Sequence, residues 1–194
     1  FVYGNFQLGE GMPLELRIGK QIVSWGESTF IQGGINSINP VDVSALRVPG
    51  AEVKEAFLPE ETVLFTLQMN EYFSTQLLYL LKWHETRPEP AGSYFSTNDF
   101  GTPGGNKVVL GFGAFSDQGV DFRPLGGPLI SDFQNVKRLA DRKASDDGQY
   151  GFNVKLFLPD FNNGTEFGLY FLNYHSRVPL ISGRTGTQAG LGNA

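Results

Sequence analysis

The residue types that could perform chemistry are few and scattered in this sequence. His84 and His175 are the only two histidines and there is no cysteine, so no His-x-x-x-His pair or thiolate cluster is available to bind zinc. Asp141, Asp146 and Asp147 form an acidic run that lacks the ligand spacing of an EF-hand. We interpret this run as a solvated loop and predict no metal site.

Motifs for catalysis are also missing from the sequence. No Gly-x-Ser-x-Gly elbow, phosphate-binding loop or Gly-x-Gly-x-x-Gly after a strand occurs, and Gly101–Gly105 is interpreted as a flexible, turn-rich stretch. We therefore expect no enzyme activity and no cofactor. An outer-membrane lipid hydrolase remains a third hypothesis, which requires a serine and a histidine within hydrogen-bond reach of each other.

Composition narrows the class of protein further. A net charge of −5 excludes a nucleic-acid partner, which needs a basic face to neutralise phosphates. The chain contains 25 Gly, 17 Phe, 7 Tyr and 2 Trp, and only 18% of its residues are charged. Such a composition favours strands over helices. No apolar run approaches the roughly 18 residues of a membrane-spanning helix, so a membrane crossing would have to use strands.

Alternating side chains indicate the elements that position the polar residues. Successive side chains of a strand point to opposite faces of a sheet, so a period of two reports two environments. Between Thr62 and Asn70, Val63, Phe65 and Leu67 share one face and polar residues share the other, with Leu64 as an apolar exception. One face is expected to contact lipid or a core, and the other water.

Three pairs of such runs predict three antiparallel β-hairpins. The clearest turn contains Asn163-Gly164, because this pair readily takes positive φ. The length of the runs suits a tilted strand crossing a bilayer, which needs about 9–11 residues, better than the roughly 5–6 residues usual in soluble sheets. The paired ranges are 1–9 with 14–25, 62–70 with 75–85, and 149–158 with 165–177.

Long segments rich in Gly, Pro, Asn and Asp separate the hairpins, at 26–61 and 86–148 and from 178 onward. Short turns at one end and long extracellular loops at the other are typical of outer-membrane barrels. Lys107–Phe115 is placed inside a loop, because a crossing there would put the tight 159–164 turn on the long-loop side. The predicted fold is all-β: an antiparallel transmembrane β-barrel of which residues 1–194 form a single segment, since six strands are fewer than the roughly eight of the smallest closed barrels.

This fold assigns candidate functional residues to two places. In the long loops, Trp25 is either a headgroup anchor, which is the more economical interpretation, or a ligand-stacking residue. The segment 36–50 is either a plain extracellular loop or an inward-folding constriction that an Asp42–Arg47 ion pair could hold. The candidates facing the lumen are Glu15, Arg17, Gln21, Thr66, Gln68, Asn70, Lys82, Asn153 and Lys155, and the loop or constriction candidates are Trp25, Asn39, Asp42 and Arg47.

Several motifs spread over the chain resemble one bacterial family. They are RIGKQIVSWGES (17–28), INSINPVD (35–42), LRVPG (46–50), PAGSYFSTND (90–99), GQYG (148–151), EFGLY (166–170) and NYHSR (173–177). Together they resemble the proteobacterial outer-membrane family catalogued as domain of unknown function 1302, whose members look like long-chain fatty-acid-transporter barrels. The resemblance implies localisation in the bacterial outer membrane, contact with its lipids and lipopolysaccharide, and transport of hydrophobic small molecules. It also implies an inner-membrane resistance-nodulation-division transporter and an outer-membrane lipoprotein as partners.

A soluble protein is the alternative from a different class. A β-sandwich that binds a carbohydrate or another ligand through exposed Trp and Tyr has the same alternation, but its apolar faces pack against each other across two sheets. The two hypotheses differ in what covers Val63, Phe65, Leu67, Phe152, Val154 and Leu156.

Overall fold

The computed structural model describes residues 1–194 except 10, 27–35, 97–98, 111–120, 128–134 and 185–194. The regular elements of the described chain are β-strands and 3-10 helices of three or four residues, with no α-helix among them. No helix in this part of the chain has the length and apolar character needed to span a membrane. The prediction of an all-β chain is confirmed.

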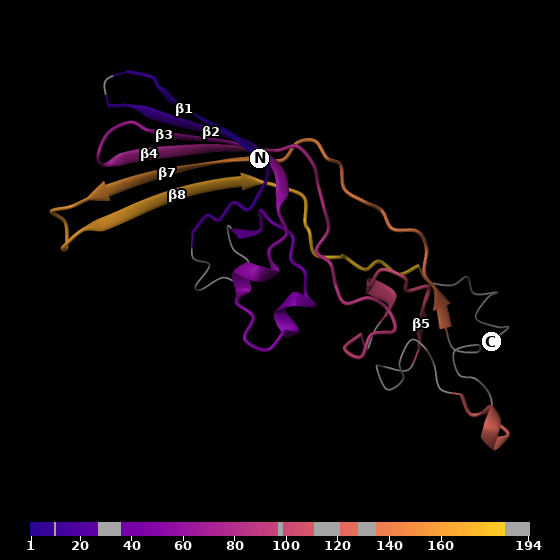
Figure 1. The fold of residues 1–194 in the computed structure, drawn as a ribbon. Coiled ribbons are helices and arrows are strands. Elements are labelled where there is room, and N and C mark those ends of the chain that lie inside the picture. The colour runs from indigo at the N-terminus through magenta and orange to yellow at the C-terminus, as the bar shows by residue number, and fades with distance from the viewer. Residues whose placement is uncertain (10, 27–35, 97–98, 111–120, 128–134, 185–194) are drawn as a thin grey trace.

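Six strands form one antiparallel sheet in the order β1-β2-β3-β4-β7-β8 (Figure 1). Three hairpins joined by short turns build this sheet, as the alternation predicts, and each strand pairs with its neighbours without a crossover between them. The strands are β1 (Val2–Gln7), β2 (Pro13–Gln21), β3 (Glu60–Gln68), β4 (Phe73–Leu80), β7 (Tyr150–Leu158) and β8 (Thr165–Asn173).

The strands end earlier at the loop side than the alternation predicts. The sequence predicts strands reaching residues 25, 85 and 177, whereas β2, β4 and β8 end at 21, 80 and 173. After β2 the backbone of Val23 bonds to a side chain instead of a strand, because the Asn39 amide donates to the Val23 carbonyl over 2.9 Å. Alternation in the sequence therefore continues past the point where the ladder stops.

The turns at the opposite end are short, and two of the three use asparagine. The Oδ1 atom of Asn70 accepts hydrogen bonds from the backbone N–H groups of Tyr72 (2.9 Å) and Phe73 (2.8 Å). Asn70 is therefore a turn residue, which corrects its prediction as a strand residue facing the lumen. In the last hairpin Asn162 and Asn163 have φ values of 49° and 61°, in the left-handed region that Asn tolerates better than most residues.

A second, two-stranded sheet lies within the longest loop. It pairs β5 (Lys107–Val109) with β6 (Asn135–Lys137) and lies apart from the six-stranded sheet (Figure 1). The run starting at Lys107 is thus not part of the main sheet, which agrees with its predicted place inside a loop. Residues 111–115 of this run lie outside the described chain. The 3-10 helices are η2 (Ala45–Arg47), η3 (Val53–Ala56), η4 (Asp99–Gly101) and η5 (Arg123–Leu125).

The two faces of the main sheet differ sharply in chemistry. The strand register aligns a row of apolar residues on one face and, one position along, a row of polar residues on the other. We call these the apolar face and the polar face. The apolar row is Leu16, Phe65, Leu77, Phe152 and Phe171, and the polar row is Asn5, Glu15, Thr66, Gln76, Asn153 and Tyr170.

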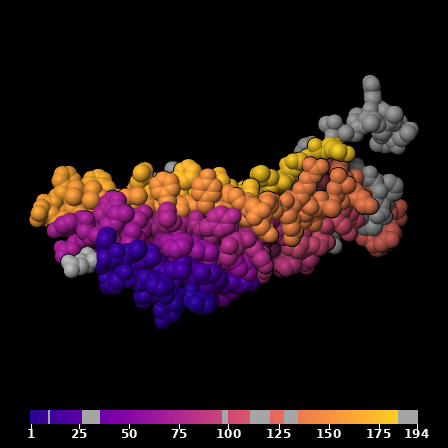
Figure 2. All heavy atoms as spheres, turned by 90° about the horizontal axis from the view of Figure 1, so that it is seen from above, coloured from indigo at the N-terminus to yellow at the C-terminus, as the bar shows by residue number. Residues whose placement is uncertain are grey.

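The apolar face is exposed. Leu77 is 55% exposed, Leu169 66% and Phe171 46%, and in Figure 2 the strand side chains lie side by side from indigo to yellow. The six apolar residues that a β-sandwich would pack across two sheets all lie on this one face, on β3 and β7. Three of them, Phe65, Phe152 and Leu156, are exposed.

Candidate functional site

The polar face gathers most of the residues predicted to face a lumen. The strand register pairs Glu15 with Thr66. It also pairs Gln68 with Ser74, which is paired in turn with Lys155. Lys82 is different, because it follows the end of β4 and is exposed beyond the sheet. The predicted residues that share the polar face are Glu15, Arg17, Gln21, Thr66, Gln68, Asn153 and Lys155.

Charges on the polar face are paired near the turns. Arg17 donates to both carboxylate oxygens of Glu15 from Nε and Nη2, each over 2.9 Å, which is the bidentate geometry that strengthens such pairs. Lys155 lies 2.9 Å from Glu166 on the neighbouring strand. Each charge at this end of the face thus has an opposite charge beside it.

A hydrogen-bond network centred on Gln76 crosses the middle of the polar face. Its Nε2 atom donates to the Thr66 hydroxyl over 3.1 Å. Its Oε1 atom accepts from the Asn153 amide (2.8 Å) and from the Trp25 indole N–H (2.9 Å). The amide of Gln76 therefore joins three strands to a residue that lies outside the sheet.

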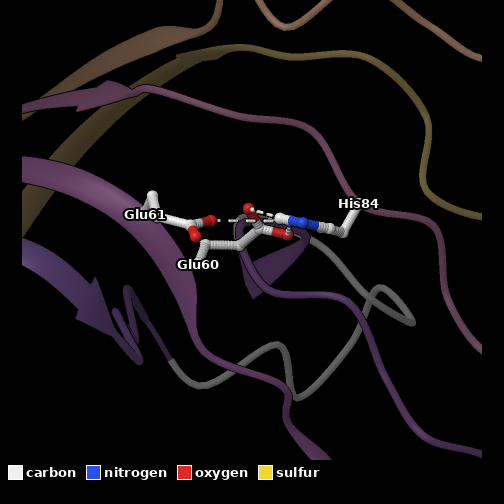
Figure 3. Close-up of side chains that lie close together, drawn as sticks. All are labelled: Glu60, Glu61 and His84. Carbon is white, nitrogen blue, oxygen red and sulfur yellow. Dashed lines mark hydrogen bonds and ion pairs between the residues drawn. The ribbon is translucent and has the colours of Figure 1, made fainter.

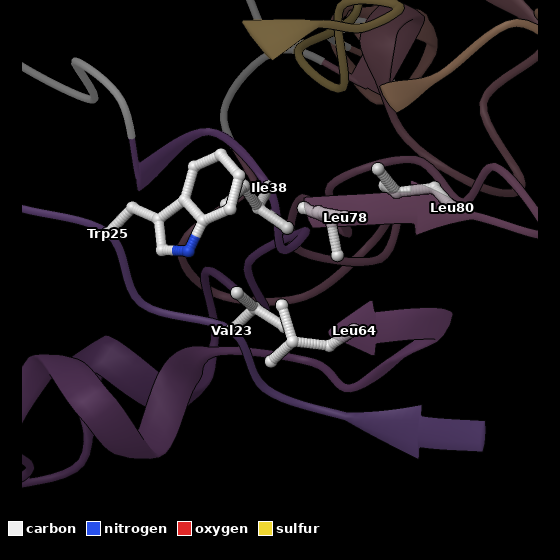
Figure 4. Packing of buried hydrophobic residues seen from close by; sticks show 6 residues of the cluster. All are labelled: Val23, Trp25, Ile38, Leu64, Leu78 and Leu80. Carbon is white, nitrogen blue, oxygen red and sulfur yellow. The ribbon is translucent and has the colours of Figure 1, made fainter. Parts of the chain in front are cut away.

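Trp25 lies against the polar face, inside an apolar cluster (Figure 4). Its side chain is only 2% exposed, which contradicts its interpretation as an anchor at the headgroup level. Leu64, the apolar exception in the alternation of β3, belongs to the same cluster. The buried members are Val23, Trp25, Ile38, Leu64, Leu78 and Leu80, with Tyr170 and Leu172 packed against them.

Residues 22–26 and 36–40, which we call the covering segments, lie over this part of the face. Asn36 accepts from the Trp25 N–H (2.7 Å) and donates to the Gly26 carbonyl (2.8 Å), and Asn39 bonds both backbone groups of Val23. Ile38 is fully buried. The start of the 36–50 segment therefore folds against the polar face of the sheet, whereas the prediction that it narrows a lumen stays a prediction.

The rest of that segment is held differently from the prediction. Asp42 accepts from the N–H (3.0 Å) and hydroxyl (2.5 Å) of Ser44, and chiefly this hydroxyl hydrogen bond lowers the pKa of Asp42. Arg47 instead pairs with Glu89 and lies 4.5 Å from the centre of the Phe95 ring. The predicted Asp42–Arg47 pair is therefore wrong, because each residue has a different partner.

A cluster of charged residues lies where the sheet meets its loops (Figure 3). Glu60 is fully buried and Arg177 only 4% exposed, and the Arg177 Nη1 atom donates to Glu60 (3.0 Å) and to the His84 carbonyl (2.8 Å). The His84 Nδ1 atom lies 3.1 Å from Glu60, and the Arg177 Nε donates to the Ser37 carbonyl over 3.3 Å. The cluster thus ties the start of β3 to the chain after β4, after β8 and within a covering segment.

Glu60, Glu61 and His84 could together offer three ligand atoms to a metal, since these atoms lie within 4.8 Å of one another. Arg177 and Lys20 already neutralise the two carboxylates, Lys20 from 3.3 Å, so a divalent cation would be added to a site without net negative charge. The sequence gives no signal for the Glu60–Arg177 pair, because 117 positions separate the two residues.

The comparisons with known proteins agree with the motifs. No curated protein and no solved structure matches the chain significantly. The family described as "Protein of unknown function (DUF1302)" matches over residues 1–194. The chain therefore belongs to this family of unknown function, domain of unknown function 1302.

Proposed function

We propose that the chain forms part of the wall of a bacterial outer-membrane β-barrel that conducts apolar or amphipathic small molecules. The observation that carries this proposal is the contrast between the two faces of a single sheet. One face is apolar across six strands and exposed, and the other is polar and partly covered by the chain itself. Barrel strands in the outer membrane show this division between a lipid-facing and a lumen-facing side.

The dimensions of the sheet support a membrane. Strands β2, β3, β7 and β8 have nine residues each, which at about 3.3 Å per residue gives roughly 30 Å. With the tilt of about 40° usual for barrels, the strands span roughly 23 Å, close to the apolar band of about 25 Å. The apolar face also carries aromatic residues at both ends, with Tyr79 opposite Tyr150 at the loop end and Phe73 at the turn end.

The same proposal defines what must complete the wall. Strands β1 and β8 each have one partner in the sheet, and an unpaired strand edge in lipid costs several kcal/mol per backbone group. Closure therefore requires further strands beside β1 and β8. The lipids and lipopolysaccharide contact the apolar face, while an inner-membrane transporter and a lipoprotein remain partners implied by the family resemblance.

The conducting role is supported by the mixed chemistry of the polar face. The ion pairs Glu15–Arg17 and Lys155–Glu166 make the turn end of the polar face hydrophilic, whereas the cluster around Trp25 is apolar. A passenger with both polar and apolar parts finds complementary groups along this path. The hydrolase hypothesis gains no support from the described histidines, whose hydrogen-bond partners are the carboxylate of Glu60 and the carbonyl of Asp147.

Arginine substitutions at two exposed leucines test the membrane assignment. Leu169→Arg places a charge in the middle of β8 on the apolar face, and Leu180→Arg is the control at a residue outside the strands that is 85% exposed. For the complete protein refolded into liposomes, we expect Leu169→Arg to lower the free energy of unfolding by about 2–4 kcal/mol and Leu180→Arg to leave it nearly unchanged. Changes within about 0.5 kcal/mol for both variants, the range of ordinary surface substitutions, would show that lipid does not cover Leu169 and would refute the barrel. A soluble sandwich, which would also bury Leu169, is distinguished because the complete protein then stays in solution and does not fold into the liposomes.

Transport is tested separately in the same liposomes. We expect the complete protein to admit an amphipathic fluorescent dye faster than protein-free liposomes of the same composition. Equal uptake rates, with the protein folded in the bilayer, would leave a barrel without the proposed conducting role.

A further inference from the structure

The indole of Trp25 occupies a shaped socket on the polar face. Leu64 and Leu78 belong to the buried cluster around the indole, and the Tyr170 ring lies 6.4 Å from it, centre to centre. At the polar end of the socket, Gln76 Oε1 accepts the indole N–H over 2.9 Å. The socket therefore matches a flat apolar group that carries one hydrogen-bond donor.

Glycine at position 151 makes room for this ring. A Cβ atom added to Gly151 would lie 2.9 Å from Cζ3 of Trp25 and 2.7 Å from the Phe171 carbonyl oxygen. Real Cβ atoms essentially never approach other atoms so closely. Any side chain at this position would thus narrow the socket from the sheet side.

A second acceptor belongs to the same network. Asn153 is 1% exposed and donates from Nδ2 to Gln76, but its Oδ1 atom is buried without a hydrogen-bond partner. A buried acceptor without a donor costs about 1–3 kcal/mol, and the indole of Trp25 has only one N–H to donate. The network around the socket thus has more acceptor capacity than its occupant satisfies.

The way in which Trp25 is attached to the chain allows its indole to be replaced by another group. Strand β2 ends at Gln21, so Trp25 makes no ladder hydrogen bonds, and its backbone N–H is bound by the side chain of Asn36. The indole can therefore leave the sheet together with the covering segments while all six strands stay paired.

We propose that the Trp25 socket is a binding site for a passenger with a flat apolar body and a hydrogen-bond donor, and that Trp25 is the built-in competitor for this site. The inference rests on the proposed function, because it takes the polar face as the path of the passenger. Binding at the socket then displaces Trp25 and moves the covering segments away from the wall. The site selects passengers by shape and by the donor that Gln76 and Asn153 accept.

Removing the competitor tests the socket directly. The full chain contains two tryptophans, so the variant Trp25→Ala with Trp83→Phe contains none, and the emission of added indole reports its own binding. We expect saturable indole binding that is about fivefold tighter than that of 1-methylindole, the factor equivalent to one neutral hydrogen bond. Adding Gln76→Leu should abolish this preference. Absence of saturable binding, or equal affinities before Gln76 is changed, would overturn the site.

Displacement is tested with Trp25 in place. In the single variant Trp83→Phe, the buried Trp25 is the only tryptophan, and 4-propylphenol should shift its emission to longer wavelength as the indole enters water. Propylbenzene, which lacks the donor, is the matched control and should shift it much less. Emission that does not respond to either compound would refute the competition, even if the alanine variant fails to fold. If the Leu169→Arg penalty persists in that case, the barrel stands and only this inference falls.

Discussion

Arg177 is the residue whose removal should disturb the loop end of the sheet most. It is 4% exposed, and its guanidinium donates to Glu60, to the His84 carbonyl and to the Ser37 carbonyl. Arg177→Met retains much of the side-chain volume but removes all of these hydrogen bonds. Among the described residues, the carboxylate of the fully buried Glu60 then keeps His84 alone as a partner.

The expected magnitude follows from that burial. Removing one partner of a buried ion pair costs about 3–5 kcal/mol, because the other charge stays buried without compensation. Glu60→Gln should cost less, because a neutral amide replaces the carboxylate while Arg177 keeps its two carbonyl acceptors. In the double variant no charge of the pair is left, so we expect it to be more stable than Arg177→Met alone.

The four proteins of this double-mutant cycle are compared by urea unfolding of the complete protein in liposomes. Tryptophan emission is a suitable signal, since the Trp83 indole N–H donates to the carbonyl of Ser176, next to Arg177, and Trp25 lies in the covered cluster at the same sheet. A coupling free energy of about 2 kcal/mol or more between the two positions is expected from contacts of this kind. Additive effects, or an Arg177→Met variant as stable as the wild type, would show that the pair does not hold the loops to the sheet.

Two further predictions concern the loop after the covering segments and the last turn. The hydrogen bond from Ser44 lowers the pKa of Asp42 below its ordinary value of 3.8, so the stability it gives is complete above about pH 3.8 and is lost as the pH falls through the lowered value. Hydrogen exchange of residues 42–47 should accelerate over that range in the wild type and be independent of pH, apart from the intrinsic rate, in Asp42→Asn. Asn163 has a φ of 61°, so Asn163→Val should lower the free energy of unfolding by about 1–2 kcal/mol and Asn163→Gly should not, and equal unfolding midpoints for the two variants would contradict the assigned turn conformation.

The hairpins could be predicted because the information for them is local. Alternation within nine residues identifies a strand and its two faces, and the pair Asn163-Gly164 identifies a turn, so neither needs knowledge of distant residues. Pairing across the short turns then follows. The strand ends could not be predicted this way, because the ladder stops where Asn39 takes over the backbone groups of Val23.

The contacts of the loops lie beyond such reasoning. Proximity in the sequence predicts that Arg47 pairs with Asp42, but Arg47 pairs with Glu89, which lies in a different loop. Glu60 meets Arg177 because the start of β3 and the chain after β8 lie at the same end of the sheet. Charge in a sequence indicates that a partner exists, whereas the choice of partner depends on how loops fold over a sheet, which has no periodic signal.

One local signal did point to the covered site. Leu64 and Leu78 interrupt the polar face at register-paired positions on adjacent strands, and both are buried under Val23 and Trp25. Apolar residues on a face that is otherwise polar need a cover that excludes water, since exposing them would lose the free energy of their burial. The two interruptions therefore mark where another part of the chain covers the polar face of the sheet.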